Sequence, residues 1–294
     1  MHTILSFQSH VCYGYAGNSA ATFIFQRYFL EPVIVHTVYF TNHTGYGKAF
    51  GRIIPHEDVN VILNGLWEMG FWQNISAIVS GYVGSETNGN ALLEMIEKST
   101  QCSLEIPIFI DPVMGDIGRG IFVKDDVVNF FRKNALKYAD VITPNQFEAE
   151  LLSEMKIRNI EDAKKVAMCL YKRMKGKNNG KLIIIKSILH DVGHELSNLM
   201  FDGSEYFLIT TKSYDFAMHD MRIPGGFGDV FMALFSSNHI VTKDPISAFE
   251  NATNIIFMIT ENTFKKKRKE LDVINCQEEI GILQRCNRFL AKKI

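Results

Sequence analysis

Hydrophobic residues along the chain follow two alternating patterns. Short runs rich in β-branched and aromatic residues are separated by longer segments in which apolar residues recur every three or four positions. The short runs predict buried strands, and the longer segments predict amphipathic helices. Because the two patterns alternate along most of the chain, they predict an α/β fold in which helices connect the strands of a largely parallel sheet.

The predicted elements can be placed by residue number. Strands are predicted over 3–7, 33–40, 76–82, 106–112, 140–143 and 181–186, and an antiparallel pair over 199–201 and 206–209. The Asp202-Gly203 step within that pair is a hairpin signal. Helices are predicted over 17–30, 57–70, 87–99, 125–137, 146–155, 161–175, 229–240, 244–262 and 276–292.

The same pattern gives no sign of a second domain. The chain has no internal repeat, and the polar stretch 175–180 is short enough to be a surface turn rather than a linker. We therefore expect residues 1–294 to form a single domain. Its last part, residues 264–294, is predicted to be a solvated basic turn followed by a packing helix, with nucleic-acid contact as the alternative for the basic residues.

Composition narrows the class of protein. Of 294 residues, 47% are hydrophobic and 21% are charged, which is typical of a soluble globular protein. The balance of 31 basic and 32 acidic residues does not favour binding to nucleic acid or to an anionic membrane. Five scattered cysteines without a C-x-x-C pair indicate neither a disulfide framework nor a zinc site. We expect a cytoplasmic protein with no export signal and no membrane anchor.

The most informative motif is a glycine loop, residues 225–228, followed by Asp229 and an apolar run. It predicts a helix start at which free backbone amides can hold a negative charge while the carboxylate accepts a proton. That combination suits phosphoryl transfer from a nucleotide to a hydroxyl group. The alternative is a simple glycine-rich turn in which Asp229 only complements the helix dipole.

Polar residues also follow two of the predicted strands, where an open parallel sheet binds its ligands. Asp111 and Asp116 follow the fourth strand, and their carboxylates are ligands of the type that Mg²⁺ prefers. Asn145 and Glu148 follow the fifth strand with the spacing of a helix capping box, which does not prevent Glu148 from also facing a metal. An ordinary turn and an ordinary helix cap are the alternatives.

Two common nucleotide-binding motifs are missing from the sequence. Lys48 follows Gly47 but is itself followed by Ala49, so there is no Walker A loop. The Gly226-Phe227-Gly228 segment is followed by Asp229-Val230-Phe231 rather than by a third glycine, so it does not form a dinucleotide-binding fingerprint. A dehydrogenase is therefore disfavoured.

Taken together, these motifs resemble those of the pyridoxal kinases of the ribokinase-like superfamily. The resemblance extends to about residue 262 and is carried, in order, by residues 8–11, 14, 17–20, 41–47, 80–85, 111–116, 143–148 and 226–229. It implies a three-layer α/β/α fold with a central, mostly parallel sheet. It also implies ATP-dependent phosphorylation of the 5′-hydroxymethyl group of pyridoxal and related vitamin B6 forms to give the 5′-phosphate, with Mg²⁺, in a homodimer.

The resemblance assigns roles to residues of the substrate side. Asp229 corresponds to the catalytic base, and the amides of Gly226, Phe227 and Gly228 to the groups that stabilise the transferring phosphoryl. Ser9 corresponds to a hydroxyl that contacts the pyridine ring, Thr44 and Gly45 line the same pocket, and Tyr82 forms an aromatic wall. Without the resemblance, Ser9 and Thr44 are ordinary loop residues and Tyr82 an ordinary aromatic residue at a strand end.

Further roles on the nucleotide side also come from the resemblance. It places Mg²⁺ near Asp111, Asp116 and Glu148, with water between the carboxylates and the ion. It leaves open a requirement for a monovalent cation. The residues that it places around ATP are Asp111, Thr143, Glu148, Lys186, Thr211, Lys212, Ser213 and Tyr214. For Lys186, the alternative is a lysine that caps a strand in solvent.

One departure from the family pattern concerns Phe227, which stands where a small or β-branched residue is usual. A bulky side chain that pointed inward would crowd the γ-phosphate, so we expect this one to point outward. Two alternatives stay open: a hydroxymethylpyrimidine kinase, which shares the fold and the catalytic aspartate, and a vitamin B6 binding or carrier protein that has lost catalysis. The choice among pyridoxal, pyridoxine and pyridoxamine is also open.

Overall fold

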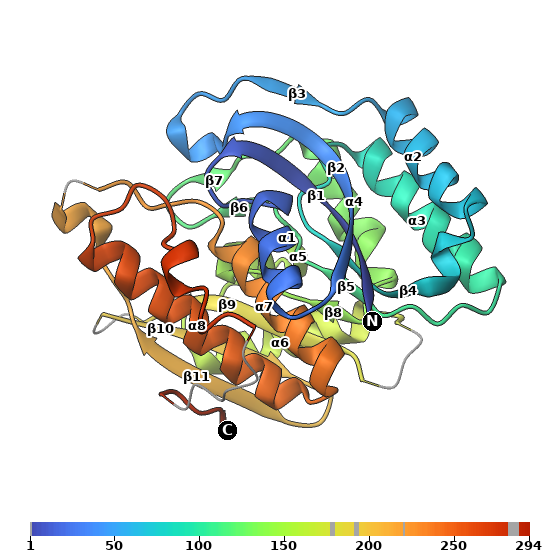
Figure 1. Ribbon diagram of the computed structural model, residues 1–294. Coiled ribbons are helices and arrows are strands. Elements are labelled where there is room, and N and C mark those ends of the chain that lie inside the picture. Colours follow the sequence, from blue (N-terminus) through green and yellow to red (C-terminus); the bar gives the residue numbers. More distant parts are fainter. Residues whose placement is uncertain (1, 177–179, 191–193, 220, 282–287) are drawn as a thin grey trace.

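The computed structural model describes residues 2–176, 180–190, 194–219, 221–281 and 288–294, and it confirms the predicted α/β architecture. In this part of the chain the main sheet has ten strands in the order β12-β11-β10-β9-β8-β5-β4-β1-β2-β3. Helices cover both of its faces, which gives three layers (Figure 1). Of the turn predicted over 175–180, residues 177–179 lie outside the described residues.

The centre of the sheet is parallel, as predicted, and its edges are antiparallel. The parallel strands are β1 (Thr3–Tyr13), β2 (Glu31–Asn42), β4 (Ile75–Ser80), β5 (Ile108–Ile110), β8 (Val141–Ile142) and β9 (Leu182–Leu189). The antiparallel strands are β3 (Gly51–Ile53), β10 (Glu195–Phe201), β11 (Tyr206–Lys212) and β12 (Lys292–Lys293). The hairpin predicted around Asp202 is confirmed, because β10 and β11 pair from Phe201 and Tyr206 outward.

Two groups of helices form the outer layers. One face is covered by α1 (Asn18–Arg27), α7 (Phe227–Thr242) and α8 (Pro245–Lys265), which lie together on the near side of the sheet in Figure 1. The other face is covered by α2 (His56–Glu68), α3 (Glu86–Gln101), α4 (Asp125–Lys133), α5 (Gln146–Ser153) and α6 (Ile160–Arg173). The described 3₁₀ turns are η1 (Thr44–Tyr46), η2 (Phe71–Asn74), η3 (Ala135–Lys137), η4 (Phe216–His219) and η5 (Ile274–Cys276).

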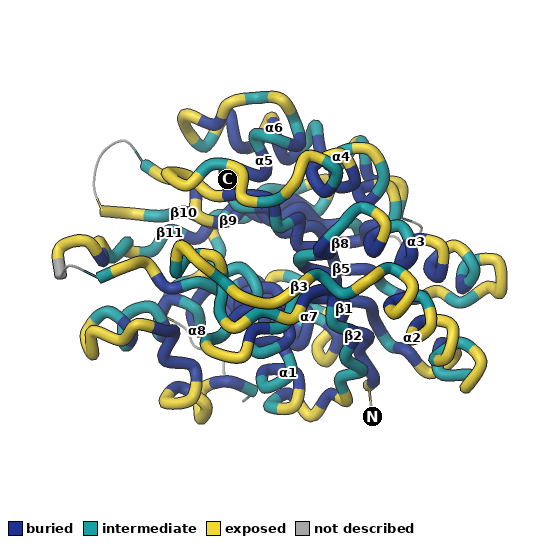
Figure 2. The backbone as a smooth tube through the Cα atoms, turned by 90° about the horizontal axis from the view of Figure 1, so that it is seen from above, coloured by how far each residue is buried: buried dark blue, intermediate teal, exposed yellow. Residues whose placement is uncertain are grey.

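The short apolar runs predicted as strands are apolar throughout because both faces of the sheet are buried. In β9, Ile183 and Ile185 belong to the core beneath α2–α6, whereas Leu182 and Ile184 belong to the core beneath α1, α7 and α8. Successive side chains of a strand point to opposite faces, so each face needs its own apolar residues. Figure 2 shows this buried centre, with exposed residues concentrated on the outer helices and loops.

The helix predicted over 276–292 is wrong for the described residues. Residues 277–281 form turns, 288–291 are irregular, and 292–293 form β12; residues 282–287 lie outside the described residues. Gly281 has φ +85, and a Cβ there would lie 1.9 Å from the carbonyl oxygen of Arg27. Further along, the side chain of Asn254 bonds both the N–H and the C=O of Phe289, at 2.9 Å and 2.8 Å. Tertiary contacts therefore replace helical hydrogen bonds.

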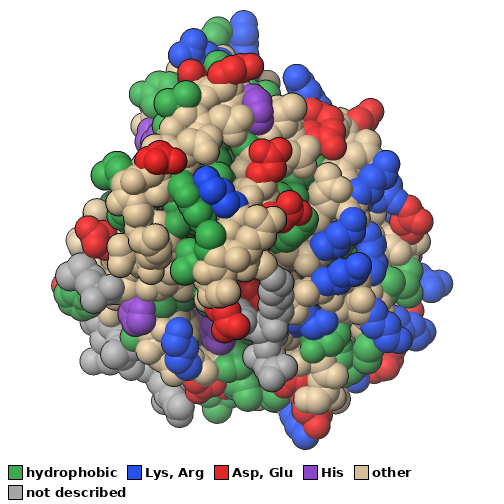
Figure 3. Space-filling model, turned by 90° about the vertical axis from the view of Figure 1, so that its right-hand side faces the viewer, with side chains coloured by type: hydrophobic (Ala, Val, Ile, Leu, Met, Phe, Trp, Pro, Cys, Tyr) green, Lys and Arg blue, Asp and Glu red, His purple; other side chains and the backbone are tan. Residues whose placement is uncertain are grey.

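Three of the five basic residues at positions 265–269 pair with neighbouring carboxylates. Lys266 and Arg268 both pair with Asp272, at 2.7 Å and 3.0 Å, and Lys265 pairs with Glu261 at 3.2 Å. Elsewhere, acidic and basic side chains are intermingled, as on the face shown in Figure 3. In the described part of the chain, no helix combines the length and the apolar character needed to span a bilayer.

Candidate active site

Most of the residues singled out from the sequence lie at one edge of the sheet. The parallel strands β1, β2, β4, β5, β8 and β9 all end there, and β11 ends there too because two antiparallel pairings connect it to β9. The first turn of α7 comes to the same edge, since a Cβ on Gly228 would lie 3.0 Å from Asp111 Oδ2 and 3.2 Å from Lys186 Nζ. The carboxyl ends of parallel strands are where such sheets bind ligands.

The glycine loop, residues 225–228, leads directly into α7. Gly226 is the N-cap residue with φ 93, and a Cβ there would lie 1.7 Å from the carbonyl oxygen of Tyr15. Only glycine combines that backbone conformation with so close an approach. The helix then begins at Phe227, one residue after the cap. The backbone N–H groups of a first helical turn lack partners within the helix and carry its positive dipole end, so this start is suited to an anion.

Asp229 stands in this first turn, and its surroundings favour a proton acceptor. Burial raises the pKa of its carboxyl to about 6, and the negative charge of Asp111 acts in the same direction. A hydrogen bond from the Gly17 amide and the charge of Lys186 act in the opposite direction. A carboxyl group with such a pKa is ionised at neutral pH and is still basic enough to take a proton during a reaction.

A buried ion pair lies beside the helix start. Lys186 Nζ donates to Asp111 Oδ1 at 2.8 Å, and Thr143 Oγ1 donates to the same oxygen at 3.0 Å. Lys186 is only 6% exposed, which excludes the alternative of a lysine that caps a strand in solvent. The structure therefore brings together a fixed positive charge and a fixed carboxylate next to Gly228.

Glu148 forms the predicted capping box of α5 and is also buried near this pair. Its Oε2 accepts the amide of Asn145 at 2.9 Å, and its Oε1 accepts the amide of Met114 at 3.0 Å. Burial and the charge of Asp111 raise the pKa of the Glu148 carboxyl well above its usual range. A buried acid held beside a second acid in this way favours the approach of a cation.

Asp116 lies on a small hairpin formed by β6 (Gly115–Asp116) and β7 (Gly120–Ile121), which the sequence analysis missed. Burial raises the pKa of its carboxyl, and the charges of Arg119 and Lys186 partly offset this effect. Across the residues that the structure describes, no group of three or more His, Cys, Asp or Glu side chains is gathered tightly enough to hold a metal ion. The predicted Mg²⁺ set is thus not assembled as a direct ligand cluster.

On the substrate side, Ser9 lies close to Asp229 through Gly17. A Cβ on Gly17 would lie 2.3 Å from Ser9 Oγ, and the amide of the same glycine bonds Asp229. Gly17 has φ +54, which favours glycine at this position. Tyr82 is partly buried after β4, where Thr37 Oγ1 donates to its carbonyl oxygen at 2.6 Å. Burial and the charge of Asp126 raise the pKa of its hydroxyl.

Thr44 and Gly45 lie in a substrate loop, which we define as residues 43–46. Arg119 Nη2 donates to Thr44 Oγ1 at 3.3 Å, and Arg222 Nη1 donates to the carbonyl oxygen of Gly45 at 2.6 Å. The substrate loop begins at His43 and lies against the glycine loop there. A Cβ on Gly225 would lie 2.6 Å from Nδ1 of His43. Two arginines therefore flank the residues expected to line the substrate pocket.

The segment expected to cover the nucleotide, residues 211–214, lies at the end of β11. Leu196 of β10 pairs with Leu189 of β9 on one side and with Thr211 on the other, so the segment is two strands away from the end of β9. Tyr214 is turned toward α8, where its hydroxyl donates to Glu261 at 2.8 Å. Lys212 extends over the ring of Tyr214 at 5.4 Å from its centroid, and Ser213 donates its amide to the carbonyl oxygen of residue 194 at 2.8 Å.

The side chain of Phe227 is engaged by other apolar residues. Its ring makes an edge contact with Phe216 of η4, with the centroids 6.4 Å apart, and it packs against the core beneath α1, α7 and α8. Its expected direction relative to a bound phosphate stays a prediction. The contact shows that the bulky residue has an apolar partner of its own.

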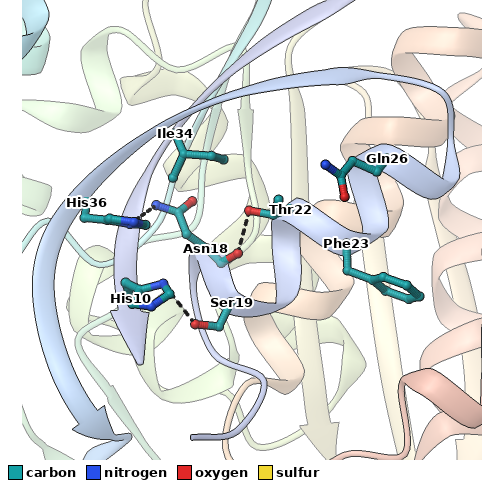
Figure 4. A pocket seen from close by; sticks show the side chains of 8 residues that line it. All are labelled: His10, Asn18, Ser19, Thr22, Phe23, Gln26, Ile34 and His36. Atoms are coloured by element: carbon teal, nitrogen blue, oxygen red, sulfur yellow. Dashed lines mark hydrogen bonds between the residues drawn. The ribbon is translucent and has the colours of Figure 1, made fainter. Parts of the chain in front are cut away.

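A separate surface pocket is lined by residues of α1, β1 and β2, and Figure 4 shows it from close by. Ser19 Oγ lies 3.2 Å from His10 Nδ1, and Asn18 Nδ2 lies 3.1 Å from His36 Nδ1. Burial lowers the pKa of both histidines. The remaining lining residues are Thr22, Phe23, Gln26 and Ile34. The sequence analysis gave a role to none of them.

Sequence reasoning missed several residues that shape the site. Gly17 and His43 fall within the motifs that carry the family resemblance, but a glycine or a histidine there does not by itself indicate a role. The positive φ of Gly17 is visible only in the structure. Arg119 and Arg222 were given no role by the sequence analysis. Glu270 follows directly after the basic turn and gave no signal, yet it reaches the substrate loop.

Comparisons with known proteins agree with this geometry. A family model described as phosphomethylpyrimidine kinase matches residues 73–273. Among curated relatives, a pyridoxal kinase PdxY from Granulibacter bethesdensis is 32% identical over 279 residues, covering 94% of this chain and 95% of the relative. One from Corynebacterium diphtheriae is 34% identical over 280 residues, covering 95% of each. A solved structure of pyridoxal kinase from Leishmania donovani, in complex with ADP and pyridoxamine, superimposes over 100% of both chains with a TM-score of 0.86 and 25% identity.

Proposed function

The chain belongs to the pyridoxal kinase family, the enzymes that phosphorylate pyridoxal with ATP, and we propose that it performs this reaction with Asp229 as the general base. The observation that carries the proposal is the position of Asp229 in the first turn of α7, beside the glycine loop, with a carboxyl pKa raised to about 6. Proton acceptor and anion-binding amides are then adjacent, as transfer to a hydroxyl group requires.

In the proposed reaction the 5′-hydroxyl group of pyridoxal attacks the γ-phosphorus of ATP in line, without a covalent enzyme intermediate. The carboxylate of Asp229 accepts the hydroxyl proton as the new P–O bond forms and the bond to ADP breaks. Amides of Phe227 and Gly228 stabilise the negative charge on the transferring group, with Gly226 setting the turn. Lys186, which is paired with Asp111, adds a buried positive charge that stabilises the same negative charge.

The substrate is held by the residues around Gly17 and the substrate loop. Ser9 and Thr44 provide hydroxyl groups that orient the pyridine ring, Gly45 leaves room for it, and Tyr82 provides an aromatic surface on which a flat ring can stack. This assignment is supported by the proximity of Ser9 and Asp229 to the same glycine.

The nucleotide and its cation are assigned to the other half of the site. Asp111, Thr143, Glu148, Lys186 and residues 211–214 provide the contacts to ATP. Glu148 fits a divalent cation, because burial and the charge of Asp111 raise the pKa of its carboxyl and so disfavour its ionisation when no cation is present. Asp111, Asp116 and Glu148 would hold Mg²⁺ through water, and the ion would neutralise charge on the phosphates. The Leishmania donovani protein, solved with ADP and pyridoxamine, supports a site for both ligand types.

The deciding experiment measures formation of pyridoxal 5′-phosphate from pyridoxal, ATP and Mg²⁺ by the purified protein and by its Asp229→Asn variant. We expect product from the wild type and a loss of kcat of about 10²- to 10⁴-fold in the variant, with pyridoxal affinity largely kept. Near-normal turnover by Asp229→Asn would remove the general-base assignment while leaving the kinase activity in place.

A hydroxymethylpyrimidine kinase is the second candidate. It is favoured by the match to the family model described as phosphomethylpyrimidine kinase. Measuring kcat/KM for pyridoxal and for hydroxymethylpyrimidine on one preparation separates the two, and we expect the higher value for pyridoxal. Vitamer binding without turnover at saturating ATP and Mg²⁺ would instead indicate a binding protein. The packing of Phe227 against Phe216 makes obstruction of the phosphate by that side chain less favoured.

We further propose that residues 1–294 act as one domain in a cytoplasmic homodimer, which sedimentation analysis would test. A reducing compartment is supported by the four cysteines that the structure describes, Cys12, Cys102, Cys169 and Cys276, all of which are free thiols. Small-molecule substrates without nucleic acid or membrane are supported by the balanced charge of the chain.

A further inference from the structure

A carboxylate from the far end of the chain is buried against the substrate loop. Glu270, which follows the basic turn after α8, has only 7% of its side chain exposed. Its Oε1 accepts a hydrogen bond from the hydroxyl of Tyr46 and lies 3.4 Å from Nε2 of His43. A buried carboxylate is costly unless it is paired and hydrogen-bonded, so the contacts with these two residues are what make its burial tolerable.

The chain makes room for this carboxylate by means of a glycine. A Cβ on Gly14 would lie 2.4 Å from Glu270 Oε2, and Gly14 has φ +99. Any other residue at position 14 would therefore be strained and would push Glu270 away. Burial acts to raise the pKa of Glu270, but the hydrogen bond from Tyr46 and the neighbouring His43 outweigh this effect and hold the pKa below its usual range. The group is thus a carboxylate in the folded protein.

His43 transmits the position of Glu270 to the substrate loop. Its Nδ1 accepts the amide of Gly45 at 3.2 Å, which places a ring proton on Nε2, the nitrogen that lies 3.4 Å from Oε1 of Glu270. The side of the ring that carries Nδ1 also lies against the glycine loop, because a Cβ on Gly225 would lie 2.6 Å from this nitrogen. One imidazole therefore contacts both loops of the site while a carboxylate fixes its orientation.

Tyr46 forms a second connection between Glu270 and the same loop. Burial and the hydrogen bond to Glu270 raise the pKa of its hydroxyl, so it stays a donor. The guanidinium carbon of Arg222 stands 3.6 Å from the centroid of the Tyr46 ring while Nη1 of the same arginine bonds the carbonyl oxygen of Gly45. The substrate loop is thus held at its amide, its carbonyl and its aromatic side chain, and two of these three attachments depend on Glu270.

We propose that Glu270 is a positioning residue for phosphoryl transfer, which orients His43 and Tyr46 and so holds Thr44 and Gly45 in the geometry that binds pyridoxal. The proposal rests on the proposed function, since it concerns the pocket for that substrate. Glu270 itself touches neither the nucleotide cluster around Asp111 nor Asp229 by any described hydrogen bond, so its effect falls on substrate binding.

The test is the Glu270→Gln variant, which keeps the size of the side chain and removes its charge. We expect the KM and the Kd for pyridoxal to rise on the order of tenfold, because the variant weakens the charge-assisted hydrogen bonding that holds the substrate loop. The KM for ATP and the kcat should stay within about twofold, because Asp229 and Lys186 keep their own partners. Glu278→Gln is the matched control: Glu278 is an exposed acid in the same segment, and its replacement should leave all constants unchanged.

The Kd for pyridoxal is measured without ATP, by absorbance titration, so that it does not depend on turnover. If the wild type binds pyridoxal but forms no product, the proposed function fails and the Kd of the variant still reports on Glu270. If the wild type is active and Glu270→Gln has the wild-type KM and Kd for pyridoxal, the positioning role is overturned. An equal rise in the KM for ATP would also overturn it, because it would indicate a general structural effect.

Tyr46→Phe provides an independent measurement should Glu270→Gln fail to fold. This variant removes a single hydroxyl group and keeps the ring that stacks with Arg222. We expect a severalfold rise in the KM for pyridoxal, and an effect in the double variant Tyr46→Phe/Glu270→Gln that is smaller than the product of the two single effects. An unchanged KM in Tyr46→Phe, or fully multiplicative effects in the double variant, would contradict the proposal.

Discussion

At the scale of single residues, Asp229 shows how one environment can serve binding and proton transfer together. Burial and the nearby Asp111 raise the pKa of its carboxyl, while the Gly17 amide and the charge of Lys186 keep it from rising further. The rise in pKa makes the carboxylate a better base, and the amide and the lysine charge that limit this rise keep it ionised at neutral pH. The position of Asp229 in a first helical turn was visible in the sequence, but these three neighbours were not, because they come from separate parts of the fold.

The pKa of Asp229 predicts the pH dependence of the reaction. A general base acts in its ionised form, so kcat/KM for pyridoxal should be constant above about pH 6 and should fall tenfold per pH unit below it. The residual activity of Asp229→Asn should lack this acidic limb. A limb centred near pH 4, the ordinary value for an aspartate, would contradict the assigned environment.

The same shift has a consequence for stability, with a definite sign. Because the folded pKa of about 6 exceeds the ordinary value of 3.8, the folded protein binds this proton more tightly than the unfolded chain does. The stabilisation from the protonated form is complete below about pH 4 and is lost as the pH rises through 6. Asp229→Asn should therefore be at least as stable as the wild type at pH 7.5, which makes its loss of activity interpretable.

Lys186 illustrates what a residue type cannot reveal. A lysine at a strand end is most often solvated, and the sequence kept that alternative open. The structure places it in a pair with Asp111, 2.8 Å apart, with Thr143 on the same oxygen. This pairing joins β9 to the ends of β5 and β8, and only the order of the strands in the sheet brings the three residues together.

At the scale of elements, the start of α7 depends on a single glycine. Gly226→Ala should be severely damaging, because the φ of 93 is strained for alanine and its Cβ would lie 1.7 Å from the carbonyl oxygen of Tyr15. We expect a destabilisation of about 2 kcal/mol or more and a fall in kcat of roughly 10²-fold as the first-turn amides shift. Thermal unfolding and steady-state kinetics measure the two effects.

Gly65→Ala is the control for that variant. Gly65 lies inside α2, where a Cβ would meet nothing within 4 Å, so the change should stabilise the helix by about 0.5–1 kcal/mol and leave kcat unchanged. If Gly226→Ala behaved like Gly65→Ala, the loop would not need its left-handed residue, and the account of the anion site would have to be abandoned.

Elements were predictable from the sequence where local signals and tertiary packing agree. The helices α1 to α8 fall close to their predicted ranges, and the capping box of Asn145 and Glu148 forms as its spacing indicates. The hairpin of β6 and β7 was missed because each strand has two residues and no periodicity. The helix predicted over 276–292 failed where Gly281 adopts a left-handed conformation and Asn254 captures the backbone of Phe289.

At the scale of the whole molecule, the last part of the chain closes back on the core. Leu271, Val273, Cys276 and Ile280 are buried in the cluster beneath α1, α7 and α8. Val273, Cys276 and Ile280 follow the i, i+3, i+7 spacing of a helix, so the pattern predicted a helix and indicated correctly that the segment packs. This packing also delivers Glu270 to the substrate loop, so the segment contributes to both the core and the site.

The dependence of the fold on this segment can be measured with two isoleucines that lie six positions apart. Ile280 is fully buried, whereas Ile274 is 43% exposed. Ile280→Ala should destabilise the protein by about 2–4 kcal/mol and lower Tm by roughly 5 to 10 °C, because it leaves a cavity in the core. Ile274→Ala should change the free energy of unfolding by no more than about 0.5 kcal/mol. Equal Tm values for the two variants would mean that the segment lies on the surface without supporting the fold. A loss in Ile280→Ala together with an unchanged KM for pyridoxal would separate its role in the core from the positioning role of Glu270.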